Sequence, residues 1–424
     1  MVRSSLRRVH PPGGDWSPYL VSACAIYGPN ASGKSTILDA ISFARGYVKN
    51  SANLSDDREP RATYFRLQEG FASKPSQYSF DFLDSTGIRY EYGFELIFGR
   101  VQSEWLNYYP EGRPRLLFER NGEEFRFSRW LKGGRMNIEA ATGPKDLALS
   151  KAAQIKHPML SKLYREIVSG IFLARHDERD EHGRMVGIIH LLEEGKVFPS
   201  DIIALLRAAD IGIANVSLKN SEYPDGAREV LDALLAALQS TERTPPAFKN
   251  ITGAEIVEAL KELSFEHAGS DGNLYPLESA VQSKGTLSWI ALSVPAIGIL
   301  RNGGVMLVDE IDASLHPRLS SLLVDLFRSK ANVGGGQLVF TTHDTYFLSR
   351  RNDSPLEPDE VWFTEKSTEG VTSLYSLADF LTRNGENFAV RYLDGRYGAV
   401  PTLVRSEIEA ILTGGTSSEA EIGS

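Results

Sequence analysis

Residues 28–36 have the types and spacing of a phosphate-binding loop. They read Gly-Pro-Asn-Ala-Ser-Gly-Lys-Ser-Thr and fit the pattern G-x-x-x-x-G-K-[ST] at every fixed position. Two glycines allow a tight turn, and the backbone N–H groups of such a loop face phosphate oxygens. The lysine would reach the β- and γ-phosphates, and the serine after it would ligate Mg²⁺. We therefore predict that this segment, the P-loop, binds a nucleoside triphosphate through Gly28, Pro29, Asn30, Ala31, Ser32, Gly33, Lys34, Ser35 and Thr36.

Two carboxylates follow an apolar run at residues 304–308. A buried parallel strand has this composition, and ligands bind at the carboxyl ends of such strands. Asp309 is the expected Mg²⁺ ligand, and Glu310 is expected to orient or deprotonate the attacking water. The alternative is a strand that ends in a solvated acidic turn. Beside a P-loop, the catalytic interpretation is favoured.

Another short apolar strand, predicted from Gln337, ends in a histidine, His343. One helix, residues 317–328, is expected between the two strands. In a doubly wound sheet this places His343 near Asp309, where it would face the γ-phosphate and sense it or position water. The alternative is a structural histidine.

The remaining periodicity predicts the elements that carry these residues. A short buried strand at 20–27 and a helix at 37–47 flank the P-loop. Alternating apolar residues on both sides of the turn 84–87, and Asn121-Gly122 further on, predict β-hairpins. From 146 to 267 the pattern is mostly helical, including Val230 to Leu238.

Composition restricts the function classes. The 424 residues carry a net charge of −9 and are 42% hydrophobic. A globally basic nucleic-acid binder is therefore disfavoured, although a local basic patch stays open. The longest apolar stretch is too short to span a bilayer, and the single cysteine, Cys24, lies in the predicted buried strand. We expect a cytoplasmic protein without a membrane partner.

The base of the nucleotide is less clearly assigned. Trp16 and Tyr19 precede the P-loop and could stack on a base, but either could equally belong to the core. A guanine-reading Asn-Lys-x-Asp stretch is not found in the sequence, which favours ATP over GTP.

Together these motifs resemble the ABC/SMC-like class of P-loop ATPases. Within it the chain resembles the prokaryotic "AAA family ATPases" of anti-phage and abortive-infection systems, of the RloA and AbiL kind, and the ATPase half of OLD-type proteins. The resemblance covers most of the chain. Its carriers are the P-loop, residues 309–317 (Asp-Glu-Ile-Asp-Ala-Ser-Leu-His-Pro), 341–344 (Thr-Thr-His-Asp), 361–366 (Val-Trp-Phe-Thr-Glu-Lys) and 392–401.

The resemblance implies a signature loop at residues 283–286, followed by a helix at 287–300. Ser283 and Gly285 would contact the γ-phosphate bound to a second subunit, so that two copies trap two ATP–Mg²⁺ between them. A serine hydroxyl, a glycine and a helix N-terminus can make an anion site, but the alternative is an ordinary helix cap. The family's metal-linking glutamine would be one of Gln68, Gln77 and Gln102.

The expected fold class is α/β, an ABC-type P-loop ATPase head with a mixed, largely parallel sheet flanked by helices. Residues 1–105 would form the N-terminal half of the head, 106–270 an inserted β-rich and helical lobe, and 271–424 the C-terminal half. The expected function is ATP hydrolysis in a homodimer or higher oligomer that gates a separate nuclease or toxin effector in anti-phage defence. The alternatives are a DNA-repair or DNA-end-sensing ATPase and a nucleotide-gated scaffold with little turnover.

Two charged segments carry no assigned chemistry. Residues 175–182 hold metal-capable side chains, but their two histidines do not share one helix face, so a solvated charged loop is predicted rather than a metal site. The arginine-rich stretch 113–135 is diluted by glutamates. An ordinary β surface or a partner interface is therefore favoured over contacts with a nucleic-acid backbone.

Overall fold

The structure is a computed structural model. It describes residues 16, 19–53, 64–209, 211–220, 261–313, 315–349, 352, 354–382, 385–401 and 404–412. No helix within these ranges is both long and apolar enough to cross a membrane.

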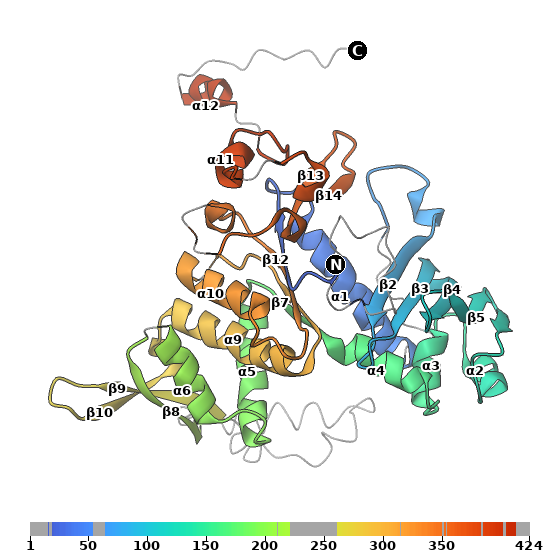
Figure 1. The fold of residues 1–424 in the computed structure, drawn as a ribbon, viewed down its shortest axis with the longest axis horizontal. Helices are drawn as coiled ribbons and strands as arrows, with labels where there is room; N and C mark the ends of the chain where they lie inside the picture. Colours follow the sequence, from blue (N-terminus) through green and yellow to red (C-terminus); the bar gives the residue numbers. More distant parts are fainter. Residues whose placement is uncertain are drawn as a thin grey trace, which may run out of the picture. The chain divides into compact units, whose positions relative to one another are not determined.

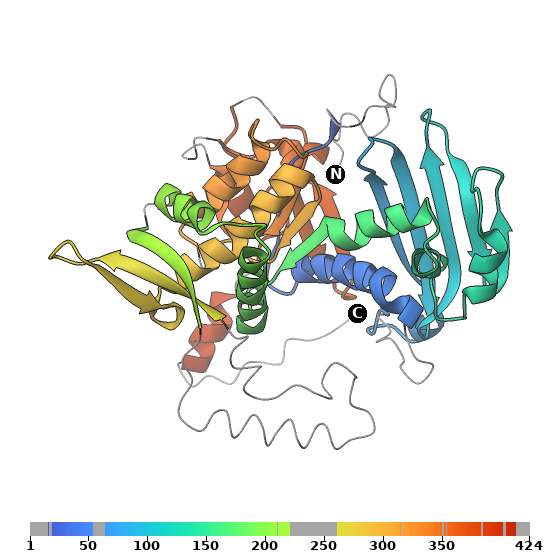
Figure 2. The same ribbon diagram turned by 90° about the horizontal axis from the view of Figure 1, so that it is seen from below.

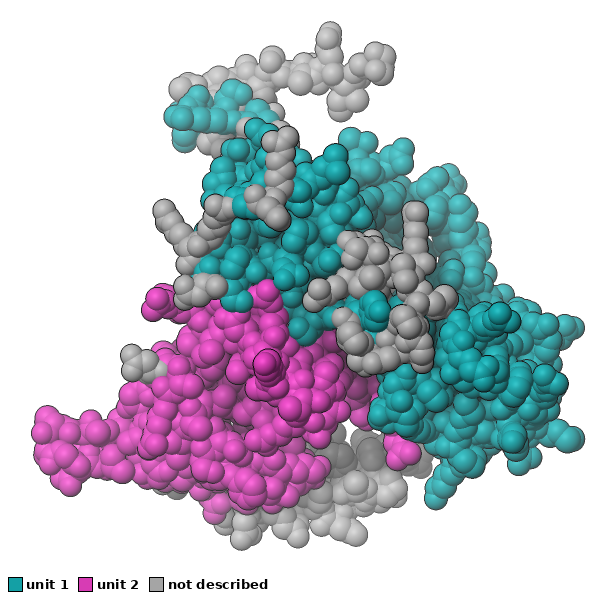
Figure 3. Space-filling model, viewed as in Figure 1, with its two compact units in different colours: residues 1–164, 341–424 teal, residues 165–340 magenta. Residues whose placement is uncertain are grey.

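The chain folds into two compact units (Figure 3). Unit 1 contains residues 1–164 and 341–424, and unit 2 contains residues 165–340. The two ends of the chain therefore belong to one unit. The predicted three-part organisation, with boundaries after residues 105 and 270, remains a prediction, and residue 105 lies inside a strand of unit 1.

Unit 1 combines a small mixed sheet, a larger antiparallel sheet and several helices (Figure 1). Its elements are β1 (Ala23–Tyr27), α1 (Lys34–Asn50), β2 (Ser76–Leu83), β3 (Arg89–Ile97), β4 (Arg100–Tyr109), β5 (Arg115–Asn121), β6 (Glu124–Phe127), α2 (Arg135–Ala141), α3 (Ala148–Gln154), the first half of α4 (Leu160–Gly170), β13 (Val361–Lys366), β14 (Thr372–Ser376), α11 (Phe388–Leu393) and α12 (Arg405–Leu412).

The strand–loop–helix predicted around the P-loop is confirmed. All five residues of β1 are buried, and β1 pairs in parallel with β13, which pairs antiparallel with β14. Helix α1 begins at Lys34 and runs to Asn50, so it extends past the predicted 37–47 at both ends. Cys24 is a buried core residue, and burial raises the pKa of its thiol to about 12.

The predicted hairpins lie in one five-stranded antiparallel sheet, in the order β2-β3-β4-β5-β6 (Figure 2). Strand β2 alternates half-buried aromatic residues with exposed polar ones, as the period-2 pattern predicts. Gly93 of β3 lies directly beneath Trp105 of β4, and a side chain there would collide with the indole.

Unit 2 holds three parallel strands, in the order β12-β11-β7, and an antiparallel sheet, in the order β10-β9-β8. Helix α10 matches the predicted 317–328 at both ends. Strand β12 begins at the predicted Gln337 but ends at Thr341, before the predicted end at His343. The elements of unit 2 are the second half of α4, β7 (Ile171–Ala174), α5 (Glu178–Glu193), α6 (Pro199–Ala208), β8 (Ile213–Asn220), β9 (Lys261–Ala268), β10 (Leu274–Glu278), α9 (Lys284–Asn302), β11 (Val305–Val308), α10 (Pro317–Arg328) and β12 (Gln337–Thr341).

The prediction that residues 146–267 are mostly helical is right for α3 to α6 and wrong for three strands. Strand β7 follows α4 directly, β8 follows α6, and β9 begins at Lys261. A run of four apolar residues such as Ile-Phe-Leu-Ala is too short for periodicity to separate a strand from a helical turn. The helix predicted around Val230 to Leu238 lies outside the described residues.

The turn between β2 and β3 depends on a buried carboxylate. Asp84 Oδ1 accepts hydrogen bonds from the backbone N–H and hydroxyl of Thr86 and from the N–H of Ile88, and Oδ2 accepts one from Lys162 at 2.9 Å. Burial raises the pKa of Asp84, but hydrogen bonds from Thr86, Lys162 and Ile88 outweigh it. The folded pKa therefore lies below the ordinary value of 3.8.

Replacing this carboxylate tests the assignment. A folded-state pKa below the unfolded one means that the ionised group stabilises the fold above pH 3.8, and this contribution is lost as the pH falls through the lowered value. We expect Asp84→Asn to lower the free energy of unfolding by about 1–2 kcal/mol at pH 7, measured by urea denaturation, and by less in acid. Asp81→Asn is the control, because Asp81 forms an exposed pair with Arg89 that contributes little. A difference that is independent of pH would contradict this account.

Candidate functional site

The P-loop has two glycines at places where its backbone meets the C-terminal strands. A Cβ on Gly28 would collide with the hydroxyl of Thr364 in β13, and a Cβ on Gly33 would collide with Thr372 in β14. Gly33 also has φ 106°, a left-handed conformation that side chains disfavour. The loop can therefore take this shape only with glycine at both positions. Backbone loops of this kind form the cradle in which phosphates bind.

Lys34 is folded over the loop that precedes it. Its Nζ donates hydrogen bonds to the carbonyls of Gly28, at 2.8 Å, and Pro29, at 3.2 Å, and the residue is 7% exposed. The next two residues, Ser35 and Thr36, are exposed in the first turn of α1. Of the predicted nucleotide-binding residues, 28–33 thus form a loop and 34–36 form the first turn of the helix that follows it. Anions bind favourably at a helix N-terminus.

His343 belongs to the same unit as the P-loop. The N–H of Thr342 donates to the carbonyl of Ile26 at 3.2 Å, and the hydroxyl of Tyr27 donates to the carbonyl of Asp344 at 2.9 Å. The segment that carries His343 therefore runs beside the end of β1, just before the P-loop begins. The His343 side chain is exposed.

Asp309 and Glu310 follow β11 in unit 2, as predicted. The N–H of Asp309 donates to the carbonyl of Ala174, the last residue of the neighbouring strand β7. Glu310 is exposed and has φ 51°, which is uncommon for a residue with a long side chain. Holding a non-glycine residue there costs about 1–3 kcal/mol, and such strain concentrates at functional sites.

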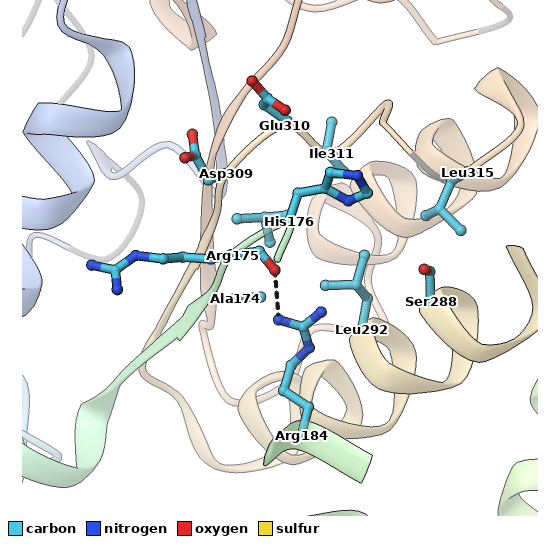
Figure 4. Close-up of a pocket in the computed structure, with 11 residues that line it drawn as sticks. Ala174, Arg175, His176, Arg184, Ser288, Leu292, Asp309, Glu310, Ile311 and Leu315 are labelled. Carbon is cyan, nitrogen blue, oxygen red and sulfur yellow. Dashed lines mark hydrogen bonds between the residues drawn. The ribbon is translucent and has the colours of Figure 1, made fainter. Parts of the chain in front are cut away.

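A pocket lies beside these two carboxylates (Figure 4). It is lined by Asp309 and Glu310 together with Arg175, His176 and Arg184. The side chains of Arg175 and His176 point in opposite directions from the end of β7. Sequence reasoning missed these residues, because it interpreted 175–182 as a solvated loop. The structure corrects this: α5 begins at Glu178, and the residues before it line the pocket. The apolar run 171–174 was the available signal, since residues after a parallel strand approach the residues after its neighbour.

Arg184 fixes the backbone at this edge of the pocket. Its Nη1 donates to the carbonyl of Arg175 at 3.0 Å and also pairs with Asp180, whose Oδ2 accepts the N–H of Arg175 at 2.8 Å. The Arg175 backbone is therefore held through both its N–H and its C=O. The side chain of Arg184 is 8% exposed, while its bond to the carbonyl of Arg175 lies at the surface. Ser288 of α9 donates to Glu181 at 3.3 Å and so joins α9 to α5.

Ser283 caps helix α9. Its Oγ accepts a hydrogen bond from the N–H of Thr286 at 3.1 Å, and the residue is exposed. The helix begins at Lys284 rather than at the predicted Leu287, so Gly285 lies in its first turn. The cap is therefore real, and contact of Ser283 and Gly285 with a γ-phosphate remains a prediction.

Other expected contributors differ in their surroundings. Trp16 is buried, and its ring lies 5.0 Å from the guanidinium of Arg89, which favours the core alternative over base stacking. Tyr19 is half-buried. Each glutamine considered as the metal link, Gln68, Gln77 and Gln102, is exposed.

Two arginines of the arginine-rich stretch are paired with acids. Arg115 lies 2.7 Å from Glu111, and Arg126 pairs with Glu119, as expected of an ordinary β surface.

Within the described part of the chain, no group of three or more His, Cys, Asp or Glu side chains could hold a metal ion. The donors available near the motifs are a hydroxyl and a carboxylate, Ser35 and Asp309. This set fits Mg²⁺, which usually binds through one or two side chains plus substrate phosphates and water.

The requirement for glycine in the P-loop can be tested by comparing Gly33, the N-cap of α1, with a glycine inside that helix. We expect Gly33→Ala to lower the free energy of unfolding by about 1–3 kcal/mol, because the new methyl group meets Thr372 and the backbone is strained. Gly46→Ala is the control: Gly46 lies in the middle of α1 with open space around its Cβ position, so alanine should stabilise by about 0.5–1 kcal/mol. Equal effects of the two substitutions in chemical denaturation would contradict the close approach.

The hydrogen bonds that Arg184 and Asp180 make with the backbone of Arg175 can be tested in a similar way. We expect Arg184→Met to cost about 1–3 kcal/mol and to speed amide hydrogen exchange of residues 175–180, because the carbonyl of Arg175 and the carboxylate of Asp180 lose their donor. Arg179→Met is the control, since Arg179 is an exposed arginine in the same helix. Unchanged exchange in Arg184→Met would show that the network does not hold this loop.

Comparisons with known proteins place the chain in a family. A profile described as "AAA domain, putative AbiEii toxin, Type IV TA system" (AAA_21) matches residues 24–349. A search of curated proteins gives no match. Similar solved structures include an SmcHead bound to the C-winged helix domain of ScpA, at 16% identity and TM-score 0.34, covering 84% of this chain and 91% of that one.

Two further structures are SMC heads. The SMC head domain from Thermotoga maritima is 11% identical, with TM-score 0.30, covering 83% of this chain and 89% of that one. The Smc head domain bound to the C-terminal domain of ScpA derived from Pyrococcus furiosus is 14% identical, with TM-score 0.26, covering 89% and 94%. The matched family region runs from β1 past His343 and includes both the P-loop and the Asp309–Glu310 pair. The chain belongs to the AAA_21 family of P-loop ATPase domains.

Proposed function

We propose that this chain binds ATP with Mg²⁺ and hydrolyses it, and that ATP closes two copies of the chain around the nucleotides. The observation that carries the proposal is the P-loop cradle: glycines that admit no side chain, a lysine folded over the loop and a helix that begins at its end. Membership of a P-loop ATPase family supports the same conclusion.

The proposed binding residues divide by role. The backbone of residues 28–33 and the ammonium of Lys34 hold the phosphates, since both present N–H donors to oxyanions. Ser35 and Asp309 are the protein ligands of Mg²⁺, which would neutralise phosphate charge when bound. In this proposal nucleotide binding brings the two motifs to the same phosphates.

Glu310 is the proposed acceptor of a proton from the attacking water. Its exposure leaves the carboxylate accessible to solvent, and its left-handed backbone fixes the direction in which the side chain leaves the strand end. His343, exposed beside the end of β1, would contact the γ-phosphate. The carbonyl of its neighbour Asp344 accepts a hydrogen bond from Tyr27, which holds this segment beside the end of β1.

The second copy would complete the site. Ser283 and Gly285 lie at the start of α9, where exposed N–H groups and a positive helix end favour an anion brought by a partner. If the γ-phosphate bridges two chains, ATP binds the closed dimer more tightly than the open state and shifts the population toward it. The anti-phage role with a separate nuclease or toxin effector rests on the motif resemblance and on the family description, which names a toxin and a toxin–antitoxin system.

Turnover by two variants tests the catalytic assignment. We expect Glu310→Gln to lower kcat by about 10²–10⁴ while ATP still binds, because the amide cannot take the proton. Lys34→Ala should instead weaken ATP binding itself. The control is Glu123→Gln, an exposed glutamate in the β5–β6 turn. Turnover of Glu310→Gln at the wild-type rate would remove Glu310 from the mechanism.

The mass of the assembly tests the proposed dimer. Light scattering of Glu310→Gln should give twice the monomer mass with ATP and Mg²⁺ and a smaller mass without nucleotide, because the trapped γ-phosphate keeps the two chains together. Ser283→Arg should abolish the ATP-dependent increase, since a long side chain at the start of α9 blocks the approach of a partner. A mass that does not respond to ATP would rule out this form of the dimer.

A further inference from the structure

The C-terminal hairpin β13–β14 is hydrogen-bonded to Ser32 of the P-loop. The hydroxyl of Thr364 lies 2.6 Å from the hydroxyl of Ser32, and the hydroxyl of Thr372 donates to the carbonyl of Ser32 at 2.9 Å. Thr364 also donates to the carbonyl of Tyr27 at 3.2 Å. Because Thr364 uses its only proton there, Ser32 is the donor in the bond between the two hydroxyls.

The hydroxyls of Ser32 and Thr364 are buried, so water does not replace a lost hydrogen-bond partner there. Ser32 is 2% exposed and Thr364 is fully buried. Removing the Thr364 hydroxyl would leave the Ser32 hydroxyl and the Tyr27 carbonyl buried without this partner, which is costly. Thr372 differs, because it is exposed and replacing it opens no core.

The hairpin in turn rests on the segment that follows it. Tyr392 packs its ring on Phe363 of β13 and on Tyr27 of β1, with centroids 5.4 Å apart in both pairs. Tyr375 of β14 donates a hydrogen bond to the carbonyl of Tyr397 at 2.8 Å. No chemistry had been assigned to the motifs at 361–366 and 392–401. These contacts show that the two motifs pack on each other and on the strand that leads into the P-loop.

We propose that Thr364 and Thr372 are positioning residues that hold the P-loop in its nucleotide-accepting shape, so that affinity for ATP depends on the C-terminal hairpin. This inference rests on the proposed function in one respect, which is that ATP is the ligand of the loop. Ser32 sits between the two glycines of the loop, and fixing its hydroxyl and its carbonyl fixes the direction of the N–H groups on both sides. A loop free to change shape would have to be ordered when ATP binds, which lowers affinity.

Nucleotide affinity is the first measurement. Thr364→Val and Thr372→Val keep the shape of threonine but remove the hydroxyl, and each should raise the Kd for ATP by about tenfold in titration calorimetry with Mg²⁺. Thr364→Ser and Thr372→Ser keep the hydroxyl and should bind ATP nearly as the natural chain does. Ser373→Ala, an exposed neighbour on β14, is the matched control. Valine variants with unchanged Kd would overturn the inference.

Amide hydrogen exchange without nucleotide separates this inference from the proposed function. Both valine variants should speed exchange of residues 28–36, with β2 and β3 as the internal reference, and both serine variants should restore protection. If the natural chain fails to bind ATP, the proposed function fails, while the exchange result still decides whether the threonines hold the loop. Unchanged exchange in both valine variants would refute the positioning role even if ATP binds.

Discussion

The hydrogen bond between Ser32 and Thr364 joins residues that are 332 positions apart in the chain. It exists because the backbone of the P-loop passes so close to β13 and β14 that only glycine fits at positions 28 and 33. The strand before the loop, β1, is fully buried and pairs with β13. The loop is therefore supported both by β1 and by the hairpin β13–β14. A phosphate-binding loop needs this support, because its N–H groups must keep their direction without a ligand.

The second group of functional candidates is built by the same means in unit 2. Asp309 is held by the backbone of the neighbouring strand. The residue after that strand, Arg175, is held through its C=O by Arg184 and through its N–H by Asp180. Ser288 connects this network to the helix that Ser283 caps. In both units the residues proposed to carry chemistry come after strands, and hydrogen bonds from other elements hold the backbone beside them.

Much of this arrangement follows from local pattern, and the rest does not. The P-loop, the strand before Asp309, helix α10 and the hairpins were predicted because each has a period or a motif within a few residues. Strand β7 was missed because four apolar residues carry no period, and Arg184 was missed because its role is defined by Arg175 and Asp180 in three dimensions. The threonines of β13 and β14 act across the whole length of the chain, where no local pattern reaches.

The backbone of Glu310 has a consequence for how such chains lose activity. Glycine or asparagine takes φ 51° more easily than glutamate, so either substitution would relieve strain while removing the carboxylate. If Glu310 is the proposed catalytic carboxylate, such a variant would lose turnover without losing stability. In the proposed dimer it would pair with intact copies and inhibit their turnover.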